Sequence, residues 1–146
     1  RAMIIITHDL GVARGRADEI VVMYGGRVME HAPAETLFRE MAHPYTSALL
    51  SSIPKINDPK HTRLTPIEGF PPDIVDGPPG CKFAPRCKYA QETCLEAHPE
   101  TTTEGAHSYA CYYPVGSDAG KEALERNTKR GQTAAGLKIR SKEEVI

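Results

Sequence analysis

Residues 2–9, which read AMIIITHD, decide the fold class that this sequence predicts. The four apolar residues 3–6 end at a polar turn, a pattern that is typical of a fully buried strand. Buried strands of this kind usually belong to parallel sheets that have neighbours on both sides. Few other segments of this chain could supply such neighbours. We therefore expect residues 2–6 to be a buried strand of an α/β fold, and we expect a further N-terminal piece to precede Arg1.

The pattern downstream alternates between strand and helix signals. Residues 10–18 have a short helix pattern that Gly15 weakens, and residues 19–23 are a second strand rich in β-branched side chains. The pair Gly25-Gly26 favours a tight hairpin turn into a strand over residues 28–31. Two helices are expected after it, over residues 34–41 and 43–53, because a proline stands at the start of each.

Composition divides the chain into three parts. Residues 1–53 carry the α/β elements, and residues 54–114 begin with a proline-rich connector and then contain all four cysteines. Residues 115–146 are polar and charged, which favours a marginal helix or a disordered tail over a packed element. The sequence thus predicts an α/β remnant, a small irregular cysteine-rich region and a polar tail.

The overall composition argues against nucleic-acid and membrane-spanning proteins. The 146 residues carry a formal net charge of −1, so no strong field favours nucleic acid or an anionic surface. No apolar run approaches the roughly 18 residues of a membrane span. We expect a cytosolic protein, or one that reaches a membrane only through a partner.

The cysteines follow the spacing Cys81-x5-Cys87-x6-Cys94-x16-Cys111. Four cysteines this close together, with no export signal in the sequence, favour a metal over disulfides. Thiolates suit iron–sulfur clusters or Zn²⁺, and the paired C-x2-C knuckles common in zinc sites are absent. Reduced, buried cysteines that pack as small hydrophobes are the alternative.

Three nearby residues bear on this hypothesis. His107 is a candidate substitute ligand, although its default is a solvated or hydrogen-bonded loop position. Arg86 and Lys88 place positive charge next to the thiols, which would offset the negative charge of a cluster.

His8 is the residue with the most catalytic promise. It follows the expected first strand, at the edge where open α/β sheets bind ligands, and there an imidazole can donate a hydrogen bond to a phosphate oxygen. A turn histidine bonded to nearby backbone is the simpler interpretation, because one histidine is not a specific motif.

Three segments resemble the last part of an ABC-transporter ATPase domain: residues 4–12 (IIITHDLGV), 17–20 (ADEI) and 23–28 (MYGGRV). The resemblance implies that His8 is the switch histidine, which contacts the γ-phosphate of ATP bound with Mg²⁺ and helps to orient the attacking water. The sequence contains no G-x-x-x-x-G-K-[ST] phosphate loop, signature segment or catalytic glutamate. We therefore expect the chain by itself to be inactive as an ATPase.

Residues 43–50 (HPYTSALL) and 81–87 (CKFAPRC) resemble the ATP-binding subunits of oligopeptide and dipeptide ABC transporters, and this likeness extends over roughly residues 2–112. It implies an ATPase subunit that powers peptide import, peripheral to the cytoplasmic face of the membrane. The implied partners are a second ATPase subunit, transmembrane permeases and, indirectly, a peptide-binding protein.

The resemblance further implies a fold class, a C-terminal remnant of a P-loop ABC ATPase domain followed by a cysteine-rich region. It also implies a [4Fe–4S] cluster whose ligands are Cys81, Cys87, Cys94 and Cys111. Zn²⁺ remains the alternative metal. The alternative functions are a non-catalytic metal-binding regulatory module and an ATPase subunit for another solute, such as nickel.

Overall fold

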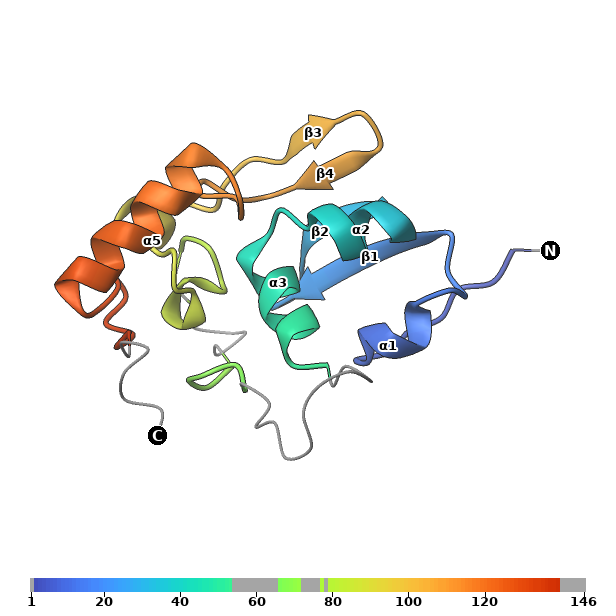
Figure 1. The fold of residues 1–146 in the computed structure, drawn as a ribbon, viewed down its shortest axis with the longest axis horizontal. Helices are drawn as coiled ribbons and strands as arrows, with labels where there is room; N and C mark the ends of the chain where they lie inside the picture. Colours follow the sequence, from blue (N-terminus) through green and yellow to red (C-terminus); the bar gives the residue numbers. More distant parts are fainter. Residues whose placement is uncertain (1, 54–65, 72–76, 78, 140–146) are drawn as a thin grey trace.

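The computed structural model describes residues 2–53, 66–71, 77 and 79–139. Much of the expected proline-rich connector therefore lies outside the described residues. The described part forms a small α/β structure in which short helices lie beside a β-hairpin. A longer helix lies at one end of the molecule (Figure 1). The helices are α1 (Leu10–Ala13), α2 (Ala34–Glu40), α3 (Pro44–Ser51), α4 (Thr93–Glu96) and α5 (Asp118–Arg130). The strands are β1 (Glu19–Tyr24), β2 (Arg27–Pro33), β3 (Thr102–Glu104) and β4 (His107–Tyr109).

The β1–β2 hairpin forms where the sequence predicts it. Side chains of β1 alternate between exposed and buried, as expected for a strand with one covered face. Gly25 and Gly26 turn the chain with φ angles of 57° and 77°, values in the left-handed region that glycine adopts without a steric penalty. The buried face of the hairpin packs against α2, whose Leu37 is completely buried.

The sheet has the order β1-β2-β4-β3, and all of its neighbouring strands are antiparallel. β4 pairs with the free edge of β2, so that Glu30 lies opposite Tyr109 and His31 opposite Ser108. This pairing joins the N-terminal α/β elements to the segment that carries the cysteines. The expected membership of residues 2–6 in a parallel sheet is therefore not found in the described part of the chain.

The predicted strand over residues 2–6 is wrong for this structure. These residues form no strand or helix, and Ile4 and Ile6 are 90% and 96% exposed. No described strand pairs with them, so their backbone groups have no sheet ladder to join and their side chains no core to enter. The following helix is also shorter than expected, since α1 ends at Ala13 before the bend at Gly15.

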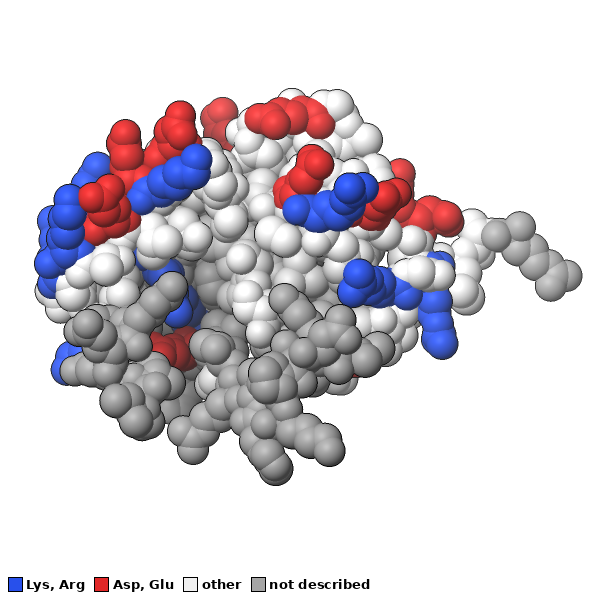
Figure 2. Space-filling model, viewed as in Figure 1, with Lys and Arg blue, Asp and Glu red and all other residues white. Residues whose placement is uncertain are grey.

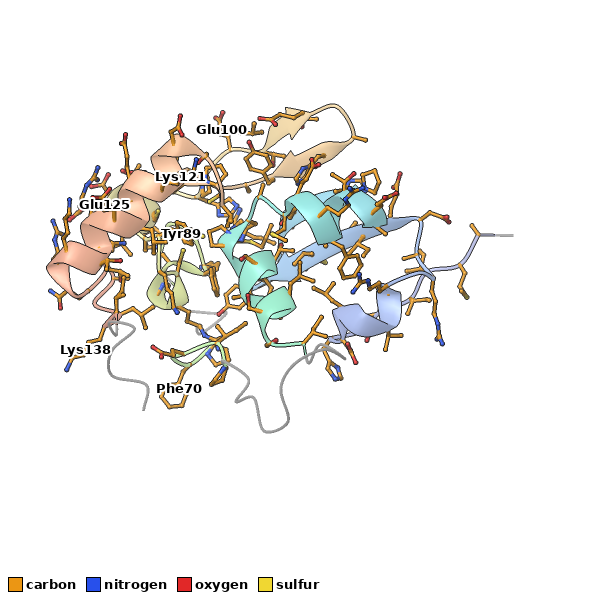
Figure 3. All side chains as sticks on the ribbon, viewed as in Figure 1. Phe70, Tyr89, Glu100, Lys121, Glu125 and Lys138 are labelled. Atoms are coloured by element: carbon orange, nitrogen blue, oxygen red, sulfur yellow. The ribbon has the colours of Figure 1, made fainter. Side chains whose placement is uncertain are left out.

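The expectation of a marginal or disordered segment after Pro114 is also wrong for residues 118–130. Ser117 caps the first turn of α5 by accepting a hydrogen bond from the backbone N–H of Gly120, and Gly131 ends the helix with φ 74°. Two of its own residues, Ala123 and Asn127, are completely buried. The outer face of α5 carries charges of both signs, including Lys121 and Glu125 (Figures 2 and 3). The face of α5 that carries Ala123 and Asn127 therefore packs against the rest of the protein, although the helix as a whole is hydrophilic.

Two groups of buried side chains make up the core, one between β1, β2 and α2 and one around Phe83. Tyr45 of α3 contacts both groups, and its ring lies 4.6 Å from Tyr24 and 5.1 Å from Phe83 between centroids. None of the helices in the described ranges combines the length and apolar character that a membrane span requires.

Candidate functional site

All four cysteines line one cavity. Cys81, Cys87 and Cys94 are buried and Cys111 is half-buried, and none of the four forms a disulfide. The enclosed space is small, about 10 Å³, which is room for about one water molecule. The aromatic residues Phe83, Tyr89, Tyr112 and Tyr113 complete much of the wall. Cysteines that are up to 30 positions apart in the sequence thus line a common space.

Short turns bring the first three cysteines together. The backbone N–H of Cys81 donates to the carbonyl of Cys94 over 2.8 Å. Gly80 makes this approach feasible, because a Cβ atom there would lie 2.2 Å from the same carbonyl oxygen. A 3₁₀ turn over Ala84–Arg86 then returns the chain, with Cys87 as its C-cap. The backbone geometry therefore holds these thiols near each other without a metal.

Cys111 reaches the cavity from the sheet. The backbone N–H of Ala110 donates to the carbonyl of Met29 over 2.9 Å, directly beyond the pairing of β4 with β2. The fourth thiol is thus positioned by β2, an element some 80 residues earlier in the chain. This explains why sequence spacing alone could not show how the fourth cysteine joins the other three.

Burial determines the protonation of the thiols. Removal from water raises the pKa of Cys81, Cys94 and Cys111, the last to about 12, and raises the pKa of Cys87 well above its usual range. The neighbouring thiolates raise the pKa of Cys87 and Cys111 further, because like charges repel. Without a compensating cation the four groups are therefore neutral thiols near pH 7. A bound cation is what would convert them to thiolate ligands.

The described residues contain no group of three or more His, Cys, Asp or Glu side chains that is already arranged to hold a metal ion. The thiols share a cavity, but they do not form a closed coordination shell in this conformation. The sequence-based assignment of Cys81, Cys87, Cys94 and Cys111 as ligands stays a prediction.

His43 and Pro44, at the start of α3, also line the cavity. The Nδ1 atom of His43 accepts a hydrogen bond from the backbone N–H of Tyr45 over 3.0 Å and so caps the helix, and Pro44 occupies the first helical turn. His43 is 1% exposed, and burial, with a smaller effect of His98, lowers its pKa to about 3. The imidazole is therefore neutral.

A buried carboxylate connects this segment to the sheet. Glu30 of β2 is completely buried, and its two oxygens accept hydrogen bonds from the backbone N–H groups of Ala42 (2.6 Å) and His43 (3.1 Å). The Nε2 atom of His107 lies 2.7 Å from the first of these oxygens. Glu30 thus fixes the start of α3 and the β3–β4 hairpin at the same time.

His107 is hydrogen-bonded, which is the default that the sequence favours, whereas the contacts of Arg86 differ from the expected ones. His107 does not line the cysteine cavity, because Glu30 engages its ring. Arg86 donates to the carbonyls of Ile67 (2.8 Å) and Glu68 (3.0 Å), and so fastens the segment before the cysteines to the 3₁₀ turn. Arg86 therefore has a structural role in this conformation, in place of the expected neutralisation of the thiols.

His8 lies in an exposed bend before α1, at the other end of the molecule from the cysteines (Figure 1). The adjacent Asp9 caps α1 by accepting from the backbone N–H of Gly11 over 2.7 Å. The structure thus separates the two sites that the sequence predicts, and the catalytic assignment of His8 stays a prediction.

Sequence reasoning missed His43, because it treated residues 43–53 as a packing helix. The available signal was the order His-Pro at the start of that helix. Proline at the first helical position marks the preceding residue as the N-cap, and a histidine there is tied to backbone through one ring nitrogen while the other stays available.

Comparisons with known proteins show which family and which relatives this chain resembles. Residues 29–94 match the family described as the oligopeptide/dipeptide transporter, C-terminal region. The chain is 46% identical over 110 residues to the oligopeptide transport ATP-binding protein OppD of Mycobacterium tuberculosis, a match that covers 75% of this chain and 18% of the relative. It is 42% identical over 114 residues to OppD of Salmonella typhimurium, covering 78% of this chain and 34% of the relative.

A dipeptide transporter protein is similar to the same extent. The dipeptide transport ATP-binding protein DppD of Bacillus subtilis is 41% identical over 112 residues, covering 76% of this chain and 33% of that relative. The chain thus spans about a third, or less, of the length of the curated relatives it matches. Residues 29–94 thus match the oligopeptide/dipeptide transporter C-terminal region, the likeness that the HPYTSALL and CKFAPRC segments predict.

Proposed function

We propose that this chain carries the C-terminal part of the ATP-hydrolysing subunit that powers ABC-type import of oligopeptides or dipeptides. The observation that carries the proposal is the 41–46% identity, sustained over 110–114 residues, to proteins named as oligopeptide or dipeptide transport ATP-binding proteins. The complete subunit would use ATP and Mg²⁺ and would pair with a second ATPase subunit. It would bind permeases at the cytoplasmic face of the membrane and receive peptide indirectly from a binding protein.

His8 is the residue of this chain that we assign to ATP hydrolysis. Its exposed position in a bend leaves the imidazole free to approach the γ-phosphate. There it would donate a hydrogen bond to a phosphate oxygen and orient the attacking water, since phosphoryl transfer depends mainly on positioning and charge stabilisation. The phosphate loop and catalytic glutamate are not in this sequence, so the isolated chain should not hydrolyse ATP.

The test uses the complete subunit with its partners. His8→Ala should lower ATP turnover by about a hundredfold or more while ATP binding persists, because the lost interaction is made at the transition state. His31→Ala is the matched control: His31 pairs with Glu19 on the sheet and should leave turnover unchanged. Turnover by the His8 variant at the wild-type rate would rule out the assignment.

The second part of the proposal is that the cysteine cavity holds a [4Fe–4S] cluster. Four sulfur donors line one cavity, and an all-cysteine ligand set is the usual one for such clusters. Cys81, Cys87, Cys94 and Cys111 would be the ligands, and the cluster would supply the cation charge that keeps them as thiolates. The thiol-bearing turns must spread to admit it, since the enclosed space now holds about one water molecule. The role is structural, because the cluster would join four points of loops that contain little regular structure.

Elemental analysis tests the cluster directly. Anaerobically purified protein should be brown and contain about four iron and four sulfide per chain. Cys87→Ser should lose the colour and make residues 79–115 more sensitive to protease. A colourless protein with one zinc would replace the cluster by the alternative metal, and metal-free wild type after reconstitution would exclude both.

A further inference from the structure

The side chain and the backbone of His43 both make hydrogen bonds, and the ring lies near that of Phe83. Its Nδ1 atom accepts from the backbone N–H of Tyr45, and its own backbone N–H donates to Glu30. Its ring centroid lies 6.1 Å from that of Phe83. Because Nδ1 acts as an acceptor, the ring proton of the neutral imidazole must be on Nε2. His43 therefore presents a fixed N–H donor.

This donor has no acceptor among the described residues. The Nε2 atom of His43 is inaccessible to solvent and makes no hydrogen bond there. A buried donor left without a partner costs about 1–3 kcal/mol, so such groups are rare in native proteins and need an explanation. The same side chain lines the cavity that the four cysteines line. An acceptor for the Nε2–H group of His43 is therefore expected inside that cavity.

Sulfur chemistry supplies a suitable acceptor. Protonated thiols accept hydrogen bonds weakly, whereas thiolates carry negative charge, as do the sulfides of a cluster, and charge strengthens a hydrogen bond. Hydrogen bonds to the sulfurs also help to set the reduction potential of an iron–sulfur cluster.

We propose that the Nε2–H group of His43 donates a hydrogen bond to a sulfur of the metal centre held by the four cysteines. The proposal rests on the cluster proposed above. It gives the histidine of the HPYTSALL segment two functions, because one ring nitrogen caps α3 and the other donates a hydrogen bond to the metal centre. It also connects the centre to the sheet, since Glu30 holds the backbone of His43.

The test separates the two functions of the ring. In His43→Asn the asparagine can still cap α3, because Asn is among the best N-cap residues, but its shorter side chain removes the donor from the cavity. Thr46→Val is the control: Thr46 is completely buried on α3, its hydroxyl also has no partner among the described residues, and it does not line the cavity. Both variants of the full chain are reconstituted anaerobically with iron and sulfide.

The hydrogen bond predicts a lower reduction potential in His43→Asn at unchanged iron content, because the donor stabilises the more negative reduced cluster. Thr46→Val should have the wild-type potential. A wild-type potential in an iron-loaded His43→Asn variant overturns the proposal and leaves the cluster standing. Wild-type protein that takes up no iron and sulfide overturns both.

A measurement on the wild type keeps the test decisive if His43→Asn does not fold. Pulsed EPR of the reduced cluster, with ¹⁵N-labelled histidine, should show coupling to one histidine nitrogen. His98→Gln should retain this coupling. This variant excludes His98, whose charge lowers the pKa of His43, as the source of the coupled nitrogen. Absence of any histidine coupling in iron-loaded wild type overturns the proposal.

Discussion

Residues 2–9 and helix α5 respond in opposite ways to the packing available to them. The first segment is rich in isoleucine, yet Ile4 and Ile6 are almost completely exposed. The helix is rich in charged residues, yet its Ala123 and Asn127 are completely buried. The comparison teaches that burial here follows the supply of complementary partners more closely than it follows hydrophobicity. Three substitutions test this conclusion.

Asn127→Ala should have the largest effect. The Nδ2 atom of Asn127 donates to the carbonyls of Lys88 (2.9 Å) and Ala90 (3.1 Å), and its Oδ1 atom accepts from Gln91 over 2.8 Å. Truncation leaves buried polar groups without their partner, so we expect a loss of about 2–4 kcal/mol in the free energy of unfolding, measured with urea. The higher helix propensity of alanine offsets only a few tenths of a kcal/mol of this.

Glu122→Ala on the exposed face of the same helix is the control, and it should change stability by less than about 0.5 kcal/mol. Equal effects of the two substitutions would show that α5 is not held by its polar contacts. The comparison with residues 2–9 would then fail.

Gly120→Ala should have the next largest effect, with a sign opposite to the usual one. Glycine in a helix normally costs about 1 kcal/mol relative to alanine. At this position an added Cβ would lie 2.1 Å from the backbone carbonyl oxygen of Pro114, which cannot move without displacing the chain that follows Cys111. We expect a loss of about 1–3 kcal/mol in thermal or urea unfolding, as for other overpacked sites. A stabilised variant would mean that α5 does not dock closely on Pro114.

The sequence predicted those parts of the fold that depend on local signals. The β-branched side chains of β1, the Gly25-Gly26 turn and the prolines that begin two helices placed these elements within about two residues of their observed bounds. The pairing of β4 with β2 and the docking of α5 depend on contacts between residues far apart in sequence, which no local pattern contains. The same limit applies to the candidate site: spacing predicted that the cysteines act together, but the position of His43 beside them follows only from the fold.

Ile6→Ala should have the smallest effect, and it is the most direct test of the comparison. Ile6 is 96% exposed, so truncation removes no buried surface and leaves no cavity. We expect a change of less than about 0.5 kcal/mol in the free energy of unfolding of this chain. The matched substitution is Ile20→Ala, because Ile20 is 8% exposed in the core beneath α2, and there the same change should cost about 2–4 kcal/mol. A loss above 1 kcal/mol for Ile6→Ala would mean that residues 2–6 are buried after all. Residues 2–6 would then pack against other residues, as their sequence predicts. Hydrophobicity would then predict burial in this segment, contrary to the conclusion drawn from its comparison with α5.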